Sequence, residues 1–306
     1  MSGLVRQLDA WFHAPVPAER LALLRIWIGG YALIYLLARA RDFLAPLGYA
    51  EGAFAPVGVV QVLAAPLSPF ALYVLYAATI ACGIPFLLGF WYRAVAPCFA
   101  LLLLWMLSYR HSWGMIFHTD NLLAIHVCLL ACAPAADVYR LYGRKGRSPS
   151  AGSGDSPPER PSGWVVRALC LATVASYVVA GVAKLETQGL HWIAGEPLRE
   201  QIAYDALRKI ELGSVHSPLG PWMLPHGWLF PPLSAFALGA ELLAPLALLG
   251  GPWAATWCVS AWLFHLGVLA TMAIVFPYPL AGCAFASFFP VERAWVRVAR
   301  RVASPS

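Results

Sequence analysis

Five ionisable side chains lie within long apolar segments of the sequence: Arg25, His126, Lys184, Glu241 and His265. A charged group at membrane depth is costly, so each of them is a candidate for function. A buried Glu241 carboxylate must be protonated or paired. Pairing with His265 would make a proton relay or a ligand anchor, and a structural hydrogen bond is the alternative. For His126 the alternative is also a buried hydrogen bond, and for Arg25 it is a side chain that reaches nearby lipid headgroups.

Lys184 offers the most specific chemistry of the five. Ala172, Ser176 and Ala180 precede it in the same apolar segment at intervals of four residues. Small residues at this spacing let a neighbouring helix approach closely, which would turn the lysine toward protein rather than lipid. An amine removed from water gives up its proton more readily, so Lys184 could act as a base. The alternative is a lysine whose charged end reaches the membrane surface.

The elements that must position these residues are membrane spans. Of the 306 residues, 60% are apolar and only 12% are charged, about half the charged share of a soluble domain. Since about twenty apolar residues in a helix cross a bilayer, we predict an all-α, polytopic integral membrane bundle of about eight helices. The expected spans are residues 21–38, 69–91, 94–109, 121–139, 164–185, 230–250, 253–275 and 277–290.

A stretch rich in Gly, Ser and Pro divides the sequence. Residues 143–163 read GRKGRSPSAGSGDSPPERPSG, which cannot bury a core and predicts a flexible linker. We therefore expect an N-terminal four-helix half over 1–142, a C-terminal half over 164–292 and a basic tail over 293–306. The C-terminal half contains a loop at residues 187–229 that is too polar to span.

Two short elements are expected outside the spans. Pro56 and Pro66 bracket an interfacial turn. Within the 187–229 loop, Pro197 can start a helix that Gly213 stops. The apolar stripe of that helix would suit either the membrane surface or packing beneath the loop, and it consists of Leu198, Ile202, Leu207 and Ile210.

Charge placement predicts the orientation in the cell membrane. If the N-terminus is cytoplasmic and eight spans follow, most Lys and Arg residues fall on the cytoplasmic side. The positive-inside rule favours this arrangement. Both termini and the 143–163 linker are then cytoplasmic, and the 187–229 loop is on the outer face.

Site-directed labelling tests this orientation. In a cysteine-free background, a single cysteine in the 143–163 linker should resist a membrane-impermeant maleimide in intact cells. A cysteine near Gly213 should react, because the predicted orientation places that loop outside. Labelling of the linker from outside would reverse the predicted topology.

The sequence around the candidate residues resembles the HTTM family, the transmembrane module shared with vitamin K-dependent γ-glutamyl carboxylase. The segment RLALLRIWIGGYALIYLLARARDF is similar to the module's opening helix, with Arg25 at its arginine position. AGVAKLETQGLHWIAGEPL resembles the AG-x-x-KL segment followed by Trp and Gly. Further on, Glu241 with Pro245, and then Phe264-His265, resemble the acidic and Phe-His positions of the downstream helices.

The resemblance implies roles for individual residues. Lys184 falls on the lysine regarded as the base that deprotonates vitamin K hydroquinone, and His265 joins it as a catalytic candidate. Arg25, Asn121, Trp192 and Glu241 become candidates for binding the cofactor. That cofactor would be vitamin K hydroquinone or another quinone, and the substrate would be a peptide or protein at the outer face.

Two departures from the carboxylase pattern limit this transfer. An Asn-His pair opens the fourth span of the carboxylase, whereas Asn121 is followed here by Leu122. The large extramembrane part that grips a propeptide is also missing. Glutamate carboxylation is therefore a weaker expectation than the binding of a quinone-like or lipid-like molecule at the outer leaflet.

Several function classes remain open after this comparison. The first is a carboxylase-like or oxidoreductase-like membrane enzyme that uses a lipid-soluble cofactor, with Lys184 as base. The second is a non-catalytic membrane protein that assists export, maturation or immunity of a partner. A transporter or a haem protein using His126 and His265 is a third. No nucleic-acid partner is expected, because the basic residues are scattered among the spans. No metal is expected either, because HExxH and paired CxxC motifs are absent from the sequence.

Overall fold

The computed structural model describes residues 3–140 and 163–296, and the regular elements within these ranges are helices. Two compact units form: unit 1 comprises the described parts of Met1–Leu169 and Phe289–Ser306, and unit 2 is Cys170–Phe288. The predicted linker, apart from Gly163, lies outside the described residues. The boundary between the two compact units falls inside the helix Gly163–Gln188.

Five helices are long and apolar enough to cross a membrane. They correspond to five of the eight predicted spans, and they confirm an all-helical, multi-pass membrane protein. These helices are α2 (Ala18–Ala38), α4 (Pro69–Leu88), α5 (Tyr92–His111), α7 (Gly163–Gln188) and α12 (Gly251–Met272).

The other three predicted spans are broken into shorter helices. Residues 121–139 contain all but the first three residues of α6 (His118–Ala131) and then turns. In 230–250, α11 (Phe230–Leu242) gives way to the 3₁₀ helix η5 (Ala244–Leu249). The last segment holds only α13 (Pro277–Leu280) and the 3₁₀ helix η6 (Cys283–Phe288).

Proline and glycine explain these breaks. Pro134 lies in the turns that follow α6, and Pro245 is the second residue of η5. A proline has no N–H to continue the helical hydrogen bonds, so it favours a break there. Pro85 and Pro97 are nevertheless accommodated inside α4 and α5. Between α13 and η6, Gly282 adopts a φ of 74°, which ends the short helix.

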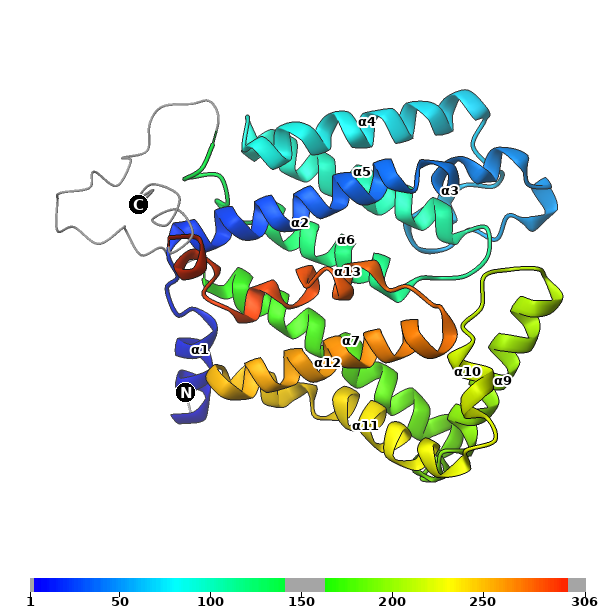
Figure 1. Ribbon diagram of the computed structural model, residues 1–306. Coiled ribbons are helices and arrows are strands. Elements are labelled where there is room, and N and C mark those ends of the chain that lie inside the picture. Colours follow the sequence, from blue (N-terminus) through cyan, green and yellow to red (C-terminus); the bar gives the residue numbers. More distant parts are fainter. Residues whose placement is uncertain (1–2, 141–162, 297–306) are drawn as a thin grey trace, which may run out of the picture. The chain divides into compact units, whose positions relative to one another are not determined.

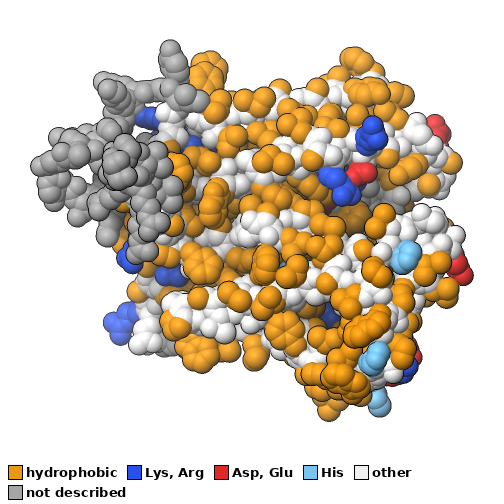
Figure 2. Space-filling view, viewed as in Figure 1, with side chains coloured by type: hydrophobic (Ala, Val, Ile, Leu, Met, Phe, Trp, Pro, Cys, Tyr) orange, Lys and Arg blue, Asp and Glu red, His pale blue; other side chains and the backbone are white. Residues whose placement is uncertain are grey.

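The exposed side chains of α4 are apolar, which indicates that lipid and not water surrounds this helix. Phe70, Tyr73 and Val74 are 77%, 52% and 49% exposed, respectively. Figure 2 shows hydrophobic side chains spread over α2, α4 and α5. An apolar surface of this extent is solvated by lipid chains and would drive association in water.

Unit 1 is built around α2, α4 and α5, which run alongside one another (Figure 1) and contact each other or α6. Between Pro56 and Pro66, where the sequence predicts a turn, the chain forms a short 3₁₀ helix, η3. The shorter elements of this unit within residues 3–62 are α1 (Gly3–Phe12), α3 (Ala40–Leu44), η1 (Ala45–Gly48), η2 (Glu51–Ala53) and η3 (Gly58–Val62).

Local chemistry sets both ends of α4. The Ser68 hydroxyl accepts a hydrogen bond from the Ala71 N–H at 3.3 Å, which caps the first turn. At the other end Gly89 adopts φ 71°, the left-handed conformation that commonly stops a helix. The chain then turns directly into α5, so α4 and α5 pack as an antiparallel pair.

The C-terminal segment of unit 1 is tied to the start of α2 by an ion pair. Arg20 donates to both carboxylate oxygens of Glu292, at 2.9 and 2.6 Å. Burial raises the pKa of the Glu292 carboxyl. The hydrogen bonds and charge of Arg20, together with a backbone hydrogen bond and the charge of Arg293, outweigh burial and hold this pKa below its ordinary value.

Unit 2 confirms the helix predicted in the 187–229 loop. Leu198 and Ile202 pack with Met223 and Phe230, whereas the rest of the expected stripe is exposed, with Leu207 at 57%. The elements of this loop are α8 (His191–Ala194), α9 (Glu196–Glu211), α10 (Leu219–Met223) and the 3₁₀ helix η4 (Gly227–Leu229).

Candidate functional site

An ion pair between α7 and α11 forms the centre of the candidate site. The Lys184 ammonium donates a hydrogen bond to Glu241 Oε1. The Glu241 side chain is 3% exposed and that of Lys184 is 23% exposed. A carboxylate so deeply buried requires a partner. Lys184 supplies it and remains the accessible member of the pair.

Trp192 of α8 is the third residue of the site. Lys184 Nζ lies 5.3 Å from the centroid of the Trp192 ring, within the range of a cation–π interaction. Trp192 is itself 2% exposed. Three sequence-predicted site residues, Lys184, Glu241 and Trp192, therefore meet in unit 2.

Gly181 explains how Lys184 reaches Glu241. A Cβ atom at position 181 would lie 2.8 Å from Leu242 Cδ2 and 3.0 Å from Glu241 Cβ. Helices α7 and α11 therefore approach closely because glycine has no side chain. Lys184 follows Gly181 by about one helical turn, so its long side chain extends along the same contact.

The packed face of α7 differs by one position from the predicted one. Thr173 and Tyr177 are buried, at 0% and 7% exposure, and with Gly181 they repeat every four residues. Of the expected stripe, Ala172, Ser176 and Ala180 are each only half-buried. Spacing alone could not separate these adjacent stripes.

A substitution at position 181 tests the close approach. Gly181→Val should lower the melting temperature of the purified protein, since overpacking costs about 1–3 kcal/mol. It should also weaken any ligand response at Lys184, because the two helices must separate. Ala183→Val, on an exposed position of the same helix, is the matched control and should melt like the wild type. Equal melting of the two variants would contradict the packing described here.

Two buried polar atoms at the site have no hydrogen-bond partner among the described residues. They are Glu241 Oε2 and Trp192 Nε1. Buried polar atoms in folded proteins are nearly always hydrogen-bonded, so each such atom requires an explanation. One is an acceptor when ionised and the other is a donor. Both side chains contact Lys184, so an unpaired acceptor and an unpaired donor belong to the two neighbours of the same amine.

A second polar pair lies between α7 and α12. The Tyr177 hydroxyl is 2.7 Å from His265 Nε2, and His265 is 5% exposed. The Tyr177 ring also packs edge-on against Trp257, with centroids 5.1 Å apart. In the structure His265 therefore pairs with Tyr177, and Glu241 pairs with Lys184. The sequence had suggested a Glu241–His265 pair.

Sequence reasoning missed Tyr177. The available signal was its spacing, since it precedes Lys184 by seven residues, about two helical turns, and so shares its helix face.

The remaining predicted site residues belong to unit 1. Arg25 is fully buried and donates to the main-chain oxygens of Ala135, at 2.9 Å, and Tyr139, at 2.6 Å. Its guanidinium is therefore held by main-chain oxygens of the segment that follows α6. Asn121 is exposed in the first turn of α6.

The structural alternative for His126 is confirmed. His126 Nε2 lies 3.3 Å from the Leu169 carbonyl oxygen, and the residue is fully buried. Since a carbonyl can only accept, Nε2 is the donor.

Unit 1 also contains a buried polar network that the sequence did not reveal. Arg110 Nη1 donates to the Tyr35 hydroxyl at 2.6 Å and to Asp120 Oδ2 at 2.9 Å. Tyr35 in turn donates to Asp120 Oδ1 at 2.9 Å, and His111 Nε2 lies 3.3 Å from Oδ2. The network joins α2, α5 and α6. Its polar atoms are satisfied by one another, which is typical of a structural cluster.

Comparison with known proteins identifies the family. No curated protein and no solved structure matches the chain significantly. The family model of the HTTM domain does match, over residues 13–290. That range covers nearly the whole chain and contains every predicted site residue, so the protein belongs to the HTTM domain family.

Proposed function

We propose that the protein binds a quinone-type or similar lipid-soluble cofactor beside Lys184, and that Lys184 acts there as a base. The observation that carries this proposal is the Lys184–Glu241–Trp192 cluster with its two buried, unpartnered polar atoms. A bound quinol supplies an acidic hydroxyl group. Trp192 Nε1 would hold an oxygen of that group by donating a hydrogen bond.

The Lys184–Glu241 pair shares one proton. For Lys184 to act as a base, its ammonium must first pass that proton to Glu241, which leaves Nζ a free amine. A medium of low dielectric constant can favour this transfer, because it replaces two buried charges by two neutral groups. When Nζ takes up a further proton, the pair becomes an ammonium and a carboxylic acid, so the site gains one positive charge.

The membrane environment supports the choice of ligand class. The site residues lie on α7 and α11, and α7 is one of the five helices suited to span a bilayer. A lipid-soluble molecule reaches such a site by diffusion in the membrane. A carboxylase-like or oxidoreductase-like reaction on a peptide or protein at the outer face remains part of the proposal, as does a cytoplasmic position of both termini.

Direct extraction tests the ligand class. The full chain is purified in mild detergent, extracted with organic solvent and analysed for quinones by mass spectrometry. We expect a quinone in roughly stoichiometric amount, and addition of a reduced quinone analogue should raise the melting temperature. The double variant Lys184→Met/Glu241→Gln, which removes both charges together, is the control and should lose both signals. If the wild type carries no quinone and does not respond to the analogue, a non-catalytic role in assisting a partner protein becomes the better explanation.

A further inference from the structure

A cavity of about 420 Å³ lies at one end of unit 1, between the α4–α5 turn and the segment that follows α6. The turn consists of Gly89, Phe90 and Trp91 and joins two helices suited to span the membrane. A turn this short between two spans must lie at a membrane surface. The cavity therefore opens at the level of the lipid headgroups.

The charges around this cavity are mostly positive. Arg93 and Arg140 line it, together with the single carboxylate of Asp137. Arg25 lies directly behind the turn, because a Cβ atom on Gly89 would come within 2.6 Å of Arg25 Nη1. Three guanidinium groups thus face or underlie a space that contains one acidic side chain, so the cavity favours an anion.

Arg25 gives this site a second, independent feature. The residue is fully buried and donates through Nη1 and Nη2 to main-chain oxygens. Its Nε is buried and has no hydrogen-bond partner within the ranges that the structure describes. Among the described residues this positive charge is met by two carbonyl dipoles and, 5.9 Å away, the Tyr92 ring, and a buried charge without a carboxylate is costly inside a membrane protein. An anion in the adjacent cavity would lower that cost.

The first turn of α5 adds to the positive potential. Trp91, Tyr92, Arg93 and Ala94 all line the cavity, and no described side chain caps this helix end. Free N–H groups at a helix N-terminus attract anions.

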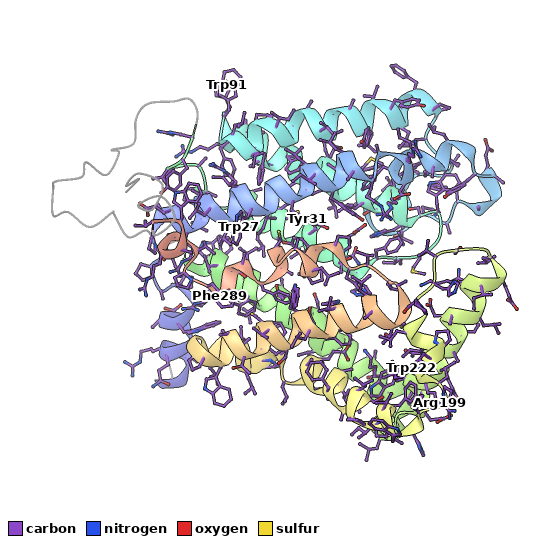
Figure 3. All side chains as sticks on the ribbon, in the orientation of Figure 1. Trp27, Tyr31, Trp91, Arg199, Trp222 and Phe289 are labelled. Carbon is purple, nitrogen blue, oxygen red and sulfur yellow. The ribbon has the colours of Figure 1, made fainter. Side chains whose placement is uncertain are left out.

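Trp91 points to a lipid rather than a soluble anion. Its side chain is 75% exposed, and Figure 3 shows it pointing away from the α4–α5 turn. Indole rings in such positions favour the headgroup region of a bilayer. A phospholipid seated here would place its phosphate in the cavity and its acyl chains against the end of α4 nearest the turn, where Ile84 and Leu88 are 48% and 37% exposed.

We infer that this cavity is a binding site for the phosphate of an anionic phospholipid, held by Arg93 and Arg140 with Arg25 behind them. Arg93 is exposed and, in the described part of the chain, makes no hydrogen bond or ion pair, so it is available for this contact. Arginine suits the role because its planar group binds phosphate oxygens in pairs.

The test compares lipids of different charge on the detergent-purified full chain. Phosphatidylglycerol in mixed micelles should raise the melting temperature by several degrees more than phosphatidylcholine with the same acyl chains. Arg93→Gln/Arg140→Gln should lose most of this difference. Arg41→Gln, an exposed arginine of α3, just beyond the C-terminal end of α2, is the matched control and should keep it. Arg93→Gln alone, at an exposed position, should lose part of the difference without loss of folding, and Arg93→Lys should retain more of it.

Three results would overturn the assignment. Equal stabilisation by the two lipids would show that charge is not recognised. A full response from both Arg93→Gln and the double variant would place the effect elsewhere. Inorganic phosphate that reproduces the whole gain would show that the site takes a soluble anion and not a lipid.

Discussion

Replacing Lys184 with arginine should abolish the response of the protein to a reduced quinone analogue, even though the positive charge is kept. A guanidinium stays protonated at ordinary pH, so it can neither pass its proton to Glu241 nor accept one from a ligand. Lys184→Ala should fail as well, because the amine is lost. Where turnover can be measured, removal of a general base should lower the rate by about 10²–10⁴-fold.

The readouts are the ligand-dependent melting shift and turnover, both measured after the variant has been shown to insert normally. Lys209→Arg is the matched control. Lys209 pairs with Asp205 at 2.9 Å, its side chain is 17% exposed, and it lies on α9 away from the proposed chemistry. It should behave as the wild type. If Lys184→Arg also responds like the wild type, Lys184 contributes only charge and the proposal of a base fails.

Replacing Asp120 with alanine should cause a large loss of stability in unit 1. The Asp120 side chain is 6% exposed and accepts hydrogen bonds from both Arg110 and Tyr35. Its removal leaves the Arg110 charge buried without its carboxylate, a change that costs about 3–5 kcal/mol in folded proteins. Asp120→Asn should cost less, because the amide oxygen can still accept one hydrogen bond.

Asp42→Ala provides the comparison. Asp42 pairs with Arg39, and the two side chains are 43% and 47% exposed. An exposed pair is worth about 0.2–1 kcal/mol, so this variant should melt close to the wild type. The measurement is thermal unfolding of the purified proteins in the same detergent. A similar melting temperature for Asp120→Ala and Asp42→Ala would mean that the buried network adds little.

The sequence predicted the membrane class and most of the long helices because apolar length is a local property. It did not predict where spans would break, since that depends on how the chain packs after a proline such as Pro245. The helix at residues 196–211 was foreseen from Pro197 and Gly213, which are local signals. Only half of its apolar stripe packs, because the partners of Leu198 and Ile202 come from distant segments.

The candidate site was predicted one residue at a time. A lysine or a glutamate within an apolar segment requires a partner of opposite charge, and that argument singled out Lys184 and Glu241. The partner's identity depends on which helices touch. Gly181 allows α7 to approach α11 closely, which brings Lys184 to Glu241. The spacing of small residues did not distinguish the stripe that contains Gly181 from the neighbouring stripe that contains Ala180. The Arg110–Asp120–Tyr35 network was missed because its members lie near helix ends, where polar residues seem unremarkable.

Because Lys184 is more exposed than Glu241, the site can be probed by chemical footprinting. A small acylating reagent that enters membranes can reach the amine of Lys184, whereas Glu241 is shielded from carboxyl-directed reagents. Acylation removes the charge of the amine and leaves the carboxylate without its counter-ion. A ligand seated over Lys184 would protect it from the reagent. The extent of labelling at this lysine would then report how much of the protein is occupied in native membranes, without any substitution.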